Sequence, residues 1–118
     1  MFTSGIERKN WTRFFDRLSK LTIGRQILLE LISEEVGDQI EEDWKAAQGF
    51  YFDHAGDALY VRTAEAEHII FRPMDIMLME DGLVRALGIR DAEGKLEIIH
   101  FRDPIFIEAR RETSALYE

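Results

Sequence analysis

The hydrophobic pattern along the chain changes period once, near Gly24. Before that point, over residues 10–21, large apolar side chains recur at α-helical spacing and leave the opposite face polar. These side chains are Trp11, Phe14, Phe15, Leu18 and Leu21. Asn10 is expected to cap this helix, because its side-chain oxygen can accept an early backbone N–H. The pattern predicts one amphipathic helix that packs its apolar face against a sheet.

Beyond Gly24 the apolar residues come in short runs, several of which alternate with polar residues as strands do. Turn signals such as Asp81-Gly82 separate the runs. The runs cover residues 26–32, 39–44, 49–53, 58–62, 68–72, 75–80, 83–90 and 96–102. Pro73 is expected to end the run at 68–72, because proline cannot donate a hydrogen bond to a central ladder. The pattern predicts a mainly β fold, with about seven or eight antiparallel strands in a small barrel-like or strongly curved sheet.

The length of 118 residues is typical of one domain, and no linker or low-complexity segment divides the chain. We expect a single domain over residues 1–118, with the helix at about 10–21, a β body at about 25–103 and a C-terminal extension at 104–118. Within the extension, residues 105–107 have the composition of one more strand. A chain of this length can bury enough apolar surface to fold without disulfides, and it contains no cysteine to form them.

The chain is acidic, with 23 acidic and 15 basic residues and a formal net charge of -8. Nucleic acids and anionic membranes are recognised largely by lysine and arginine, so neither is an expected partner. The N-terminal residues do not include the apolar segment of a signal peptide. A membrane-spanning helix needs about 20 apolar residues, and every uninterrupted apolar run in the chain is much shorter. These features predict a cytoplasmic protein.

The charge is distributed unevenly, since residues 1–25 are mainly basic and residues 26–45 are mainly acidic. One interpretation is that a basic helix packs on an acidic body. The other is an acidic docking surface for a protein partner. That surface would consist of Glu34, Glu35, Asp38, Glu41, Glu42 and Asp43.

Four segments, taken in order, resemble a known family. Residues 11–19 are similar to its helix W-x-x-F-F-D-x-L-S, residues 29–39 to a segment L-E-V-x-G-x-x-x-G-x-Q, and residues 49–59 and 94–102 to two later motifs. The chain thereby resembles the bacterial domain-of-unknown-function family 5335 over about residues 6–102. That family has no established activity, so the resemblance implies a single compact domain and assigns no catalytic residue.

The residues that could carry chemistry form no recognised catalytic or metal-binding pattern. His54, His68 and His100 lack the local spacing of a zinc site, and no glycine-rich phosphate loop is present. Paired acidic residues such as Glu41 and Glu42 are expected on the solvated surface. Glu30 lies within an apolar run, where it either faces a cavity or pairs with an arginine. We therefore predict no catalytic residue, no metal and no cofactor.

Three functional hypotheses follow. The first is a non-catalytic protein-interaction module that forms a homo-oligomer or binds a protein partner; the methionines at 74, 77 and 79 then pack in the core or at a contact between copies. The second is a barrel that binds a small anionic ligand. Its site would be lined by Tyr60, His68, Arg72, His100 and Arg102. The third, which depends on charge alone, is an acidic inhibitor of a basic partner.

Overall fold

The computed structural model describes residues 2–106, and one helix near the N-terminus stands out in it. A short 3-10 turn, η1 (Arg8–Asn10), leads into helix α1 (Trp11–Thr22). This confirms the predicted helix. Asn10 does not cap it, however: its side chain accepts a hydrogen bond from the Arg13 guanidinium at 3.3 Å. The backbone of Asn10 is already helical, whereas a capping side chain needs an extended backbone at its own residue.

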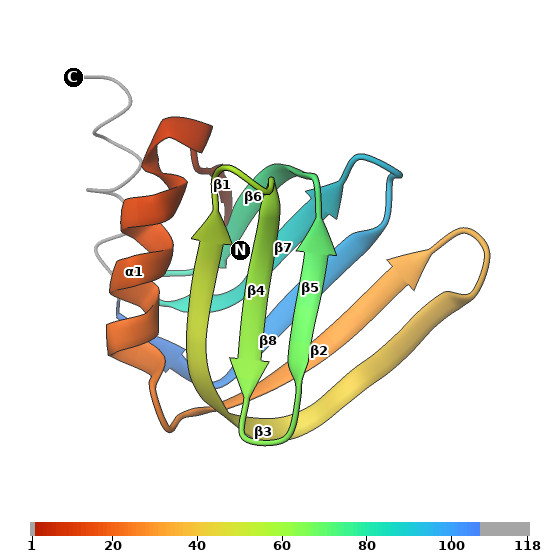
Figure 1. The fold of residues 1–118 in the computed structure, drawn as a ribbon. Helices are drawn as coiled ribbons and strands as arrows, with labels where there is room; N and C mark the ends of the chain where they lie inside the picture. The colour runs from red at the N-terminus through yellow and green to blue at the C-terminus, as the bar shows by residue number, and fades with distance from the viewer. Residues whose placement is uncertain (1, 107–118) are drawn as a thin grey trace.

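Eight antiparallel strands make up the rest of the fold (Figure 1). They are β1 (Phe2–Gly5), β2 (Gln26–Ser33), β3 (Gly37–Asp53), β4 (Ala58–Thr63), β5 (Glu67–Phe71), β6 (Pro73–Glu80), β7 (Val84–Asp91) and β8 (Leu96–Ile105). Their order across the sheet is β1-β6-β7-β8-β2-β3-β4-β5. The mainly β class with one N-terminal helix is therefore confirmed. The expected barrel-like or strongly curved sheet is wrong, because β1 and β5 do not pair and the sheet stays open.

Strand β3 departs most from the sequence prediction. Two separate strands were expected at 39–44 and 49–53, whereas the structure has one strand of 17 residues. A register shift between Ala47 and Gly49 lets the strand bend without leaving its ladders, as a bulge does. The first part of β3 pairs with β2 and the second with β4, so β3 joins two layers of the sheet.

The core lies between these two layers and is closed on one side by α1. Phe14, Phe15 and Leu18 are completely buried, and Trp11 packs edge-on against Phe52 with ring centroids 5.2 Å apart. Ser19 fixes the helix to β3, because its hydroxyl accepts a hydrogen bond from the Phe50 N–H at 2.7 Å. The large apolar side chains on one face of the helix are thus explained by its position, since the helix covers one open side of the sheet.

Three local features add to or differ from what the sequence predicted. Strand β1 was not expected, because four residues with a serine and a glycine carry no clear strand pattern. Strand β5 ends at Phe71, before Pro73 as predicted, and Pro73 itself begins β6, where a first position is one that proline tolerates within a sheet. Of the expected strand at 105–107, Ile105 ends β8, Phe106 lies beyond the strand and residue 107 is outside the described residues.

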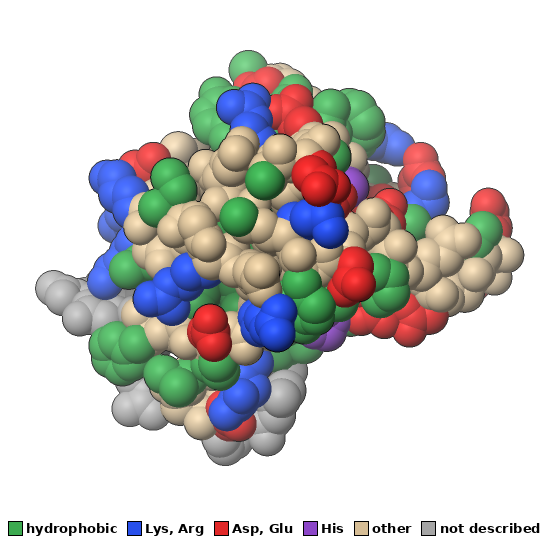
Figure 2. Space-filling model, turned by 90° about the horizontal axis from the view of Figure 1, so that it is seen from below, with side chains coloured by type: hydrophobic (Ala, Val, Ile, Leu, Met, Phe, Trp, Pro, Cys, Tyr) green, Lys and Arg blue, Asp and Glu red, His purple; other side chains and the backbone are tan. Residues whose placement is uncertain are grey.

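The β2–β3 hairpin extends past the body of the molecule on the side opposite α1 (Figures 1 and 2). Figure 2 shows acidic side chains along this projection. On the same side, within residues 2–106, no strand pairs with the outer edge of β5. Across that same range, helix α1 is far too short to span a membrane.

Candidate binding site along strand β5

Strand β5 ends the sheet, and its hydrogen-bonding pattern shows which backbone groups are free. The Thr63 N–H donates to the Ala66 carbonyl, and the Arg72 N–H donates to the Asp57 carbonyl, both at 2.8 Å. In an antiparallel pair only every second residue exchanges hydrogen bonds with its neighbour. The N–H and C=O groups of Glu67, Ile69 and Phe71 therefore point away from β4, toward the open edge.

The side chains at this edge are unusually apolar for an exposed strand. Ile69 is 41% exposed and Phe71 is 65% exposed. Ile69 lies opposite Tyr60, which lies opposite Tyr51, so these three side chains share the outer face of the front layer. Edge strands of monomeric proteins are normally protected by charge, proline or a covering element. Glu67 and Arg72 flank this segment, but within the described residues no strand covers Ile69 and Phe71 on their outer side.

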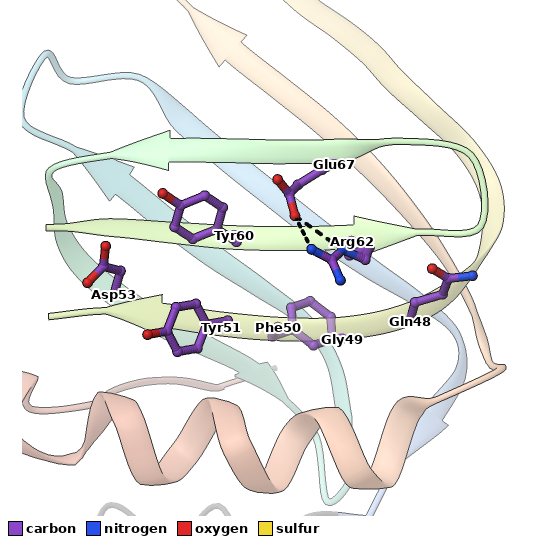
Figure 3. Close-up of a pocket in the computed structure, with 8 residues that line it drawn as sticks. All are labelled: Gln48, Gly49, Phe50, Tyr51, Asp53, Tyr60, Arg62 and Glu67. Atoms are coloured by element: carbon purple, nitrogen blue, oxygen red, sulfur yellow. Dashed lines mark hydrogen bonds and ion pairs between the residues drawn. The ribbon is translucent and has the colours of Figure 1, made fainter. Parts of the chain in front are cut away.

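A shallow hollow adjoins the edge on the outer face of β3 and β4 (Figure 3). We call it the tyrosine hollow. Its cavity volume is about 410 Å³, and the rings of Tyr51 and Tyr60 lie 6.0 Å apart beside it. At its other end, Arg62 donates two hydrogen bonds to Glu67, at 2.6 and 3.1 Å. The hollow offers aromatic surface next to a charged pair.

A second cavity runs along the edge of β5 itself, and we call it the edge groove. It has a volume of about 380 Å³ and separates β5 from the β2–β3 hairpin and the β7–β8 turn. Its lining residues are Leu31, Glu41, Ile69, Ile70, Phe71, Arg72, Asp91, Glu93, Lys95 and Glu97. One wall is thus the apolar edge strand, and the other carries most of the charge.

Glu97 is the electrostatically unusual residue of the edge groove. Burial, a hydrogen bond with Glu41 and the charge of Asp91 raise the pKa of Glu97 to about 9, and the nearby Lys95 only partly opposes this shift. A carboxyl group in such surroundings keeps its proton at neutral pH and can donate a hydrogen bond. Groups with a perturbed pKa in a cavity are typical of functional sites.

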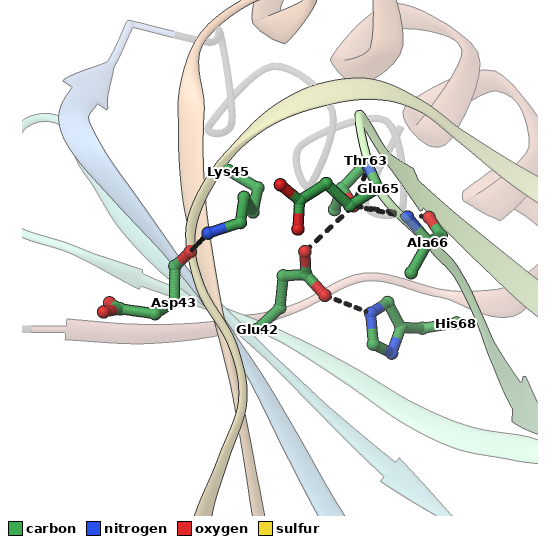
Figure 4. A network of polar contacts seen from close by, with 7 residues as sticks. All are labelled: Glu42, Asp43, Lys45, Thr63, Glu65, Ala66 and His68. Carbon is green, nitrogen blue, oxygen red and sulfur yellow. Dashed lines mark hydrogen bonds and ion pairs between the residues drawn. The ribbon is translucent and has the colours of Figure 1, made fainter.

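A polar network ties β3 to β5 and to the turn between β4 and β5 (Figure 4). The carboxylate of Glu42, which is 9% exposed, accepts a hydrogen bond from the Thr63 hydroxyl at 3.2 Å and lies 3.0 Å from His68 Nε2. The Thr63 hydroxyl oxygen in turn accepts hydrogen bonds from the backbone N–H groups of Glu65 and Ala66 in the β4–β5 turn. This network holds β5 in place relative to the hairpin.

A second histidine–carboxylate pair lies on the other face of the sheet. His100 Nε2 is 2.7 Å from Glu30 Oε1. Hydrogen bonds with Asp38 and His100 lower the pKa of Glu30, and the contact with Glu30 raises the pKa of Asp38. Glu30 was expected to face a cavity or to pair with an arginine, and the structure gives it a histidine instead.

The five residues predicted to line a small-ligand site do not share one cavity. Tyr60 lines the tyrosine hollow and Arg72 lines the edge groove. His68 binds Glu42, and His100 binds Glu30 on the opposite face. Arg102 lies near the other end of β8, where it donates to the Gln26 side chain at 2.6 Å and stacks over Trp44.

The six acidic residues predicted as a docking surface also divide among different surroundings. Glu34 and Glu35 lie exposed in the β2–β3 turn, and Asp38 lies beside Glu30. Glu41 lines the edge groove, Glu42 is nearly buried, and Asp43 is exposed on β3. Within residues 2–106 no group of three or more histidine, aspartate or glutamate side chains is placed to hold a metal ion.

Sequence reasoning missed Glu97, Ile69 and Phe71 as site residues. Glu97 has an ordinary strand context, and only the neighbouring positions of β8, β2 and β3 bring it to Glu41. The exposure of Ile69 follows from the position of β5 at the end of the strand order. The one available signal was the apolar composition of 69–71, which precedes Arg72 and Pro73.

The fold and the edge site together define a class of protein: a small mainly β domain with an open antiparallel sheet, closed on one side by a helix, whose edge strand β5 has no outer partner among residues 2–106. The chain belongs to the Family of unknown function (DUF5335), which matches residues 2–110. The resemblance seen in the sequence motifs is thereby confirmed. The chain is 30% identical over 107 residues to an "Uncharacterized protein" of Aquifex aeolicus (strain VF5), covering 89% of this chain and 96% of that protein. No solved structure matches the chain.

Proposed function

We propose that this protein is a non-catalytic interaction module that takes up an extended segment of a partner protein as an additional strand on β5. The observation that carries the proposal is that no strand of the described part of the chain pairs with the outer edge of β5. Three residues, Glu67, Ile69 and Phe71, turn their backbone groups away from β4, and Ile69 and Phe71 add exposed apolar surface. Strand addition uses such backbone groups for affinity and the flanking side-chain sites for specificity.

The space beside β5 favours a single strand over a second copy of the whole domain. Leu31 and Glu41 of the β2–β3 hairpin lie across the edge groove from β5, and the hairpin extends further outward (Figure 1). An edge-to-edge dimer would have to place another two-layered domain where this hairpin projects. One extended segment needs only the groove, whose volume is within the range of ordinary ligand sites.

The proposal is tested by selecting peptides from a random 12-residue display library on the immobilised whole protein. Bound peptides are then followed by amide hydrogen exchange of the protein. We expect exchange to slow at Glu67, Ile69 and Phe71 and to change little at His68 and Ile70, whose N–H groups already bind β4. Selected peptides that leave all three outward amides unprotected would contradict strand addition.

A matched pair of double variants distinguishes peptide binding at the β5 edge from non-specific binding to exposed apolar side chains. Ile69→Lys with Phe71→Lys places two charges on the edge and should weaken binding at least about tenfold. Ile23→Lys with Leu83→Lys removes two other exposed apolar side chains and adds the same charge away from β5. Equal loss of binding in both pairs would point to non-specific apolar capture.

Light scattering of the free protein decides whether an extended partner segment or a second copy of this chain occupies the β5 edge. A monomer that binds one peptide per chain supports the proposal. A dimer that dissociates on Ile69→Lys with Phe71→Lys would instead assign the edge to a second copy, and would overturn the proposed occupant.

A further inference from the structure

A strand added to β5 would direct its side chains alternately to two faces. On the outer face they would meet Ile69, Phe71 and the tyrosine hollow. On the inner face they would follow the direction of Ile70, which is 5% exposed, and would enter the edge groove. The far wall of the groove therefore determines which side chains are accepted there.

That far wall is acidic, and its charges come from every element around the groove. Glu41 lies on β3, Glu97 on β8 and Asp91 at the end of β7. Glu93 and Lys95, from the turn between β7 and β8, form an ion pair at 3.4 Å. The remaining cation is Arg72, directly after β5, and the neighbouring His68 is engaged by Glu42.

The Glu41–Glu97 pair is short of positive charge. Neither residue has an ion pair among the described residues, and the proton held by Glu97 is what allows the two carboxyl groups to lie together. The ammonium or guanidinium group of an incoming side chain could take over that role. It would satisfy both carboxylates and release the proton.

We propose that the segment bound at β5 carries a lysine or arginine side chain that enters the edge groove and binds between Glu41 and Glu97. This inference rests on the strand addition proposed above. It identifies the partner by chemistry: an extended segment with a basic residue flanked by apolar ones, which suits the net charge of -8 on this chain. Because the cation displaces a proton, binding tightens as the pH rises from 6 to 9.

The test uses the peptides recovered from the display library on the whole protein. In each, the residue on the inner face is set in turn to lysine, glutamine or glutamate, and affinity is measured by titration calorimetry at pH 6, 7.5 and 9. Lysine should bind about tenfold more tightly than glutamine at pH 7.5, and glutamate more weakly than both. The advantage of lysine should increase with pH.

The double variant Glu41→Gln with Glu97→Gln should remove the preference for lysine and its pH dependence while strand addition persists. Glu34→Gln with Glu35→Gln makes the same two Glu-to-Gln changes at exposed positions of the β2–β3 turn, and this control should keep both the preference for lysine and its pH dependence. Peptides that protect the β5 amides but bind equally well with lysine, glutamine or glutamate would overturn this inference and leave strand addition standing. Failure to protect those amides at all would overturn both proposals.

Discussion

Glu30 and Glu97 show that two glutamates at neighbouring positions of one sheet can have pKa values shifted in opposite directions. Glu30 on β2 and Glu97 on β8 lie on adjacent strands, where Glu30 pairs with Ile98 and Leu31 with Glu97. Successive side chains of a strand point to opposite faces, so the two carboxyl groups are on opposite sides of the sheet. Hydrogen bonds with Asp38 and His100 lower the pKa of Glu30, whereas burial and the contact with Glu41 raise that of Glu97.

The raised pKa of Glu97 predicts a stability that falls with pH. In the unfolded chain Glu97 ionises near pH 4.5, and in the folded protein near pH 9, so between these values folding requires a proton. Glu97→Gln cannot lose this proton and keeps a donor toward Glu41. We expect equal unfolding free energies at pH 4 and a variant about 1–3 kcal/mol more stable at pH 8.

Urea denaturation from pH 4 to pH 9 measures this difference. Glu34→Gln, at an exposed turn position, is the matched control and should follow the wild type within about 0.5 kcal/mol at each pH. A Glu97→Gln curve parallel to that of the wild type over the whole range would show that Glu97 is ionised in the folded protein.

Helix α1 and strand β3 show what can be read from local patterns at the scale of elements. The helix was predictable because its apolar residues lie close in sequence and repeat over three turns. Strand β3 was predicted as two strands, because residues 45–48 carry no large apolar side chain and interrupt the pattern, although they remain in the ladder through a bulge. Pairing with β2 on one side and β4 on the other keeps that segment extended. The local sequence pattern contains no information about these two partners.

The docking of α1 gives a prediction of its own. Phe15 is completely buried and lies 6.3 Å, ring to ring, from Phe50 on β3. Phe15→Ala should lower the unfolding free energy by about 3–5 kcal/mol, the usual cost of truncating a buried aromatic side chain. Thr12→Ala on the exposed face of the same helix is the control and should cost less than about 1 kcal/mol. Chemical denaturation of both variants checks this, and a Phe15→Ala loss as small as that of Thr12→Ala would mean that the helix is not docked.

At the scale of the whole molecule, a single core connects the helix with both layers. Buried residues from α1 and from each of the strands β2 to β8 belong to one contiguous apolar cluster. Neither the helix nor a layer has a separate core on which it could remain folded. We therefore expect one cooperative transition, with the same midpoint for far-ultraviolet circular dichroism and for the fluorescence of Trp11 and Trp44. Distinct midpoints for the two signals would indicate that α1 or a layer unfolds on its own.

The open side of the molecule follows from the same arrangement. Within residues 2–106 one α-helix is available to cover two open sides of a two-layered sheet, and α1 covers the side away from β5 (Figure 1). The edge groove and the exposed Ile69 and Phe71 remain on the other side. Whether a site exists there depends on strand order, which no short segment of the chain encodes.

The sequence by itself determined the mainly β class, the amphipathic helix, most strand positions and the family, because each depends on residues close together in the chain or on motifs in order. Only the tertiary structure decided that the sheet stays open, that β5 is an edge strand and that Glu97 contacts Glu41. Those features depend on which distant segments pair, and pairing is selected by the packing of the whole core. The candidate site is therefore a product of topology, assembled from residues that have no distinguishing pattern of their own.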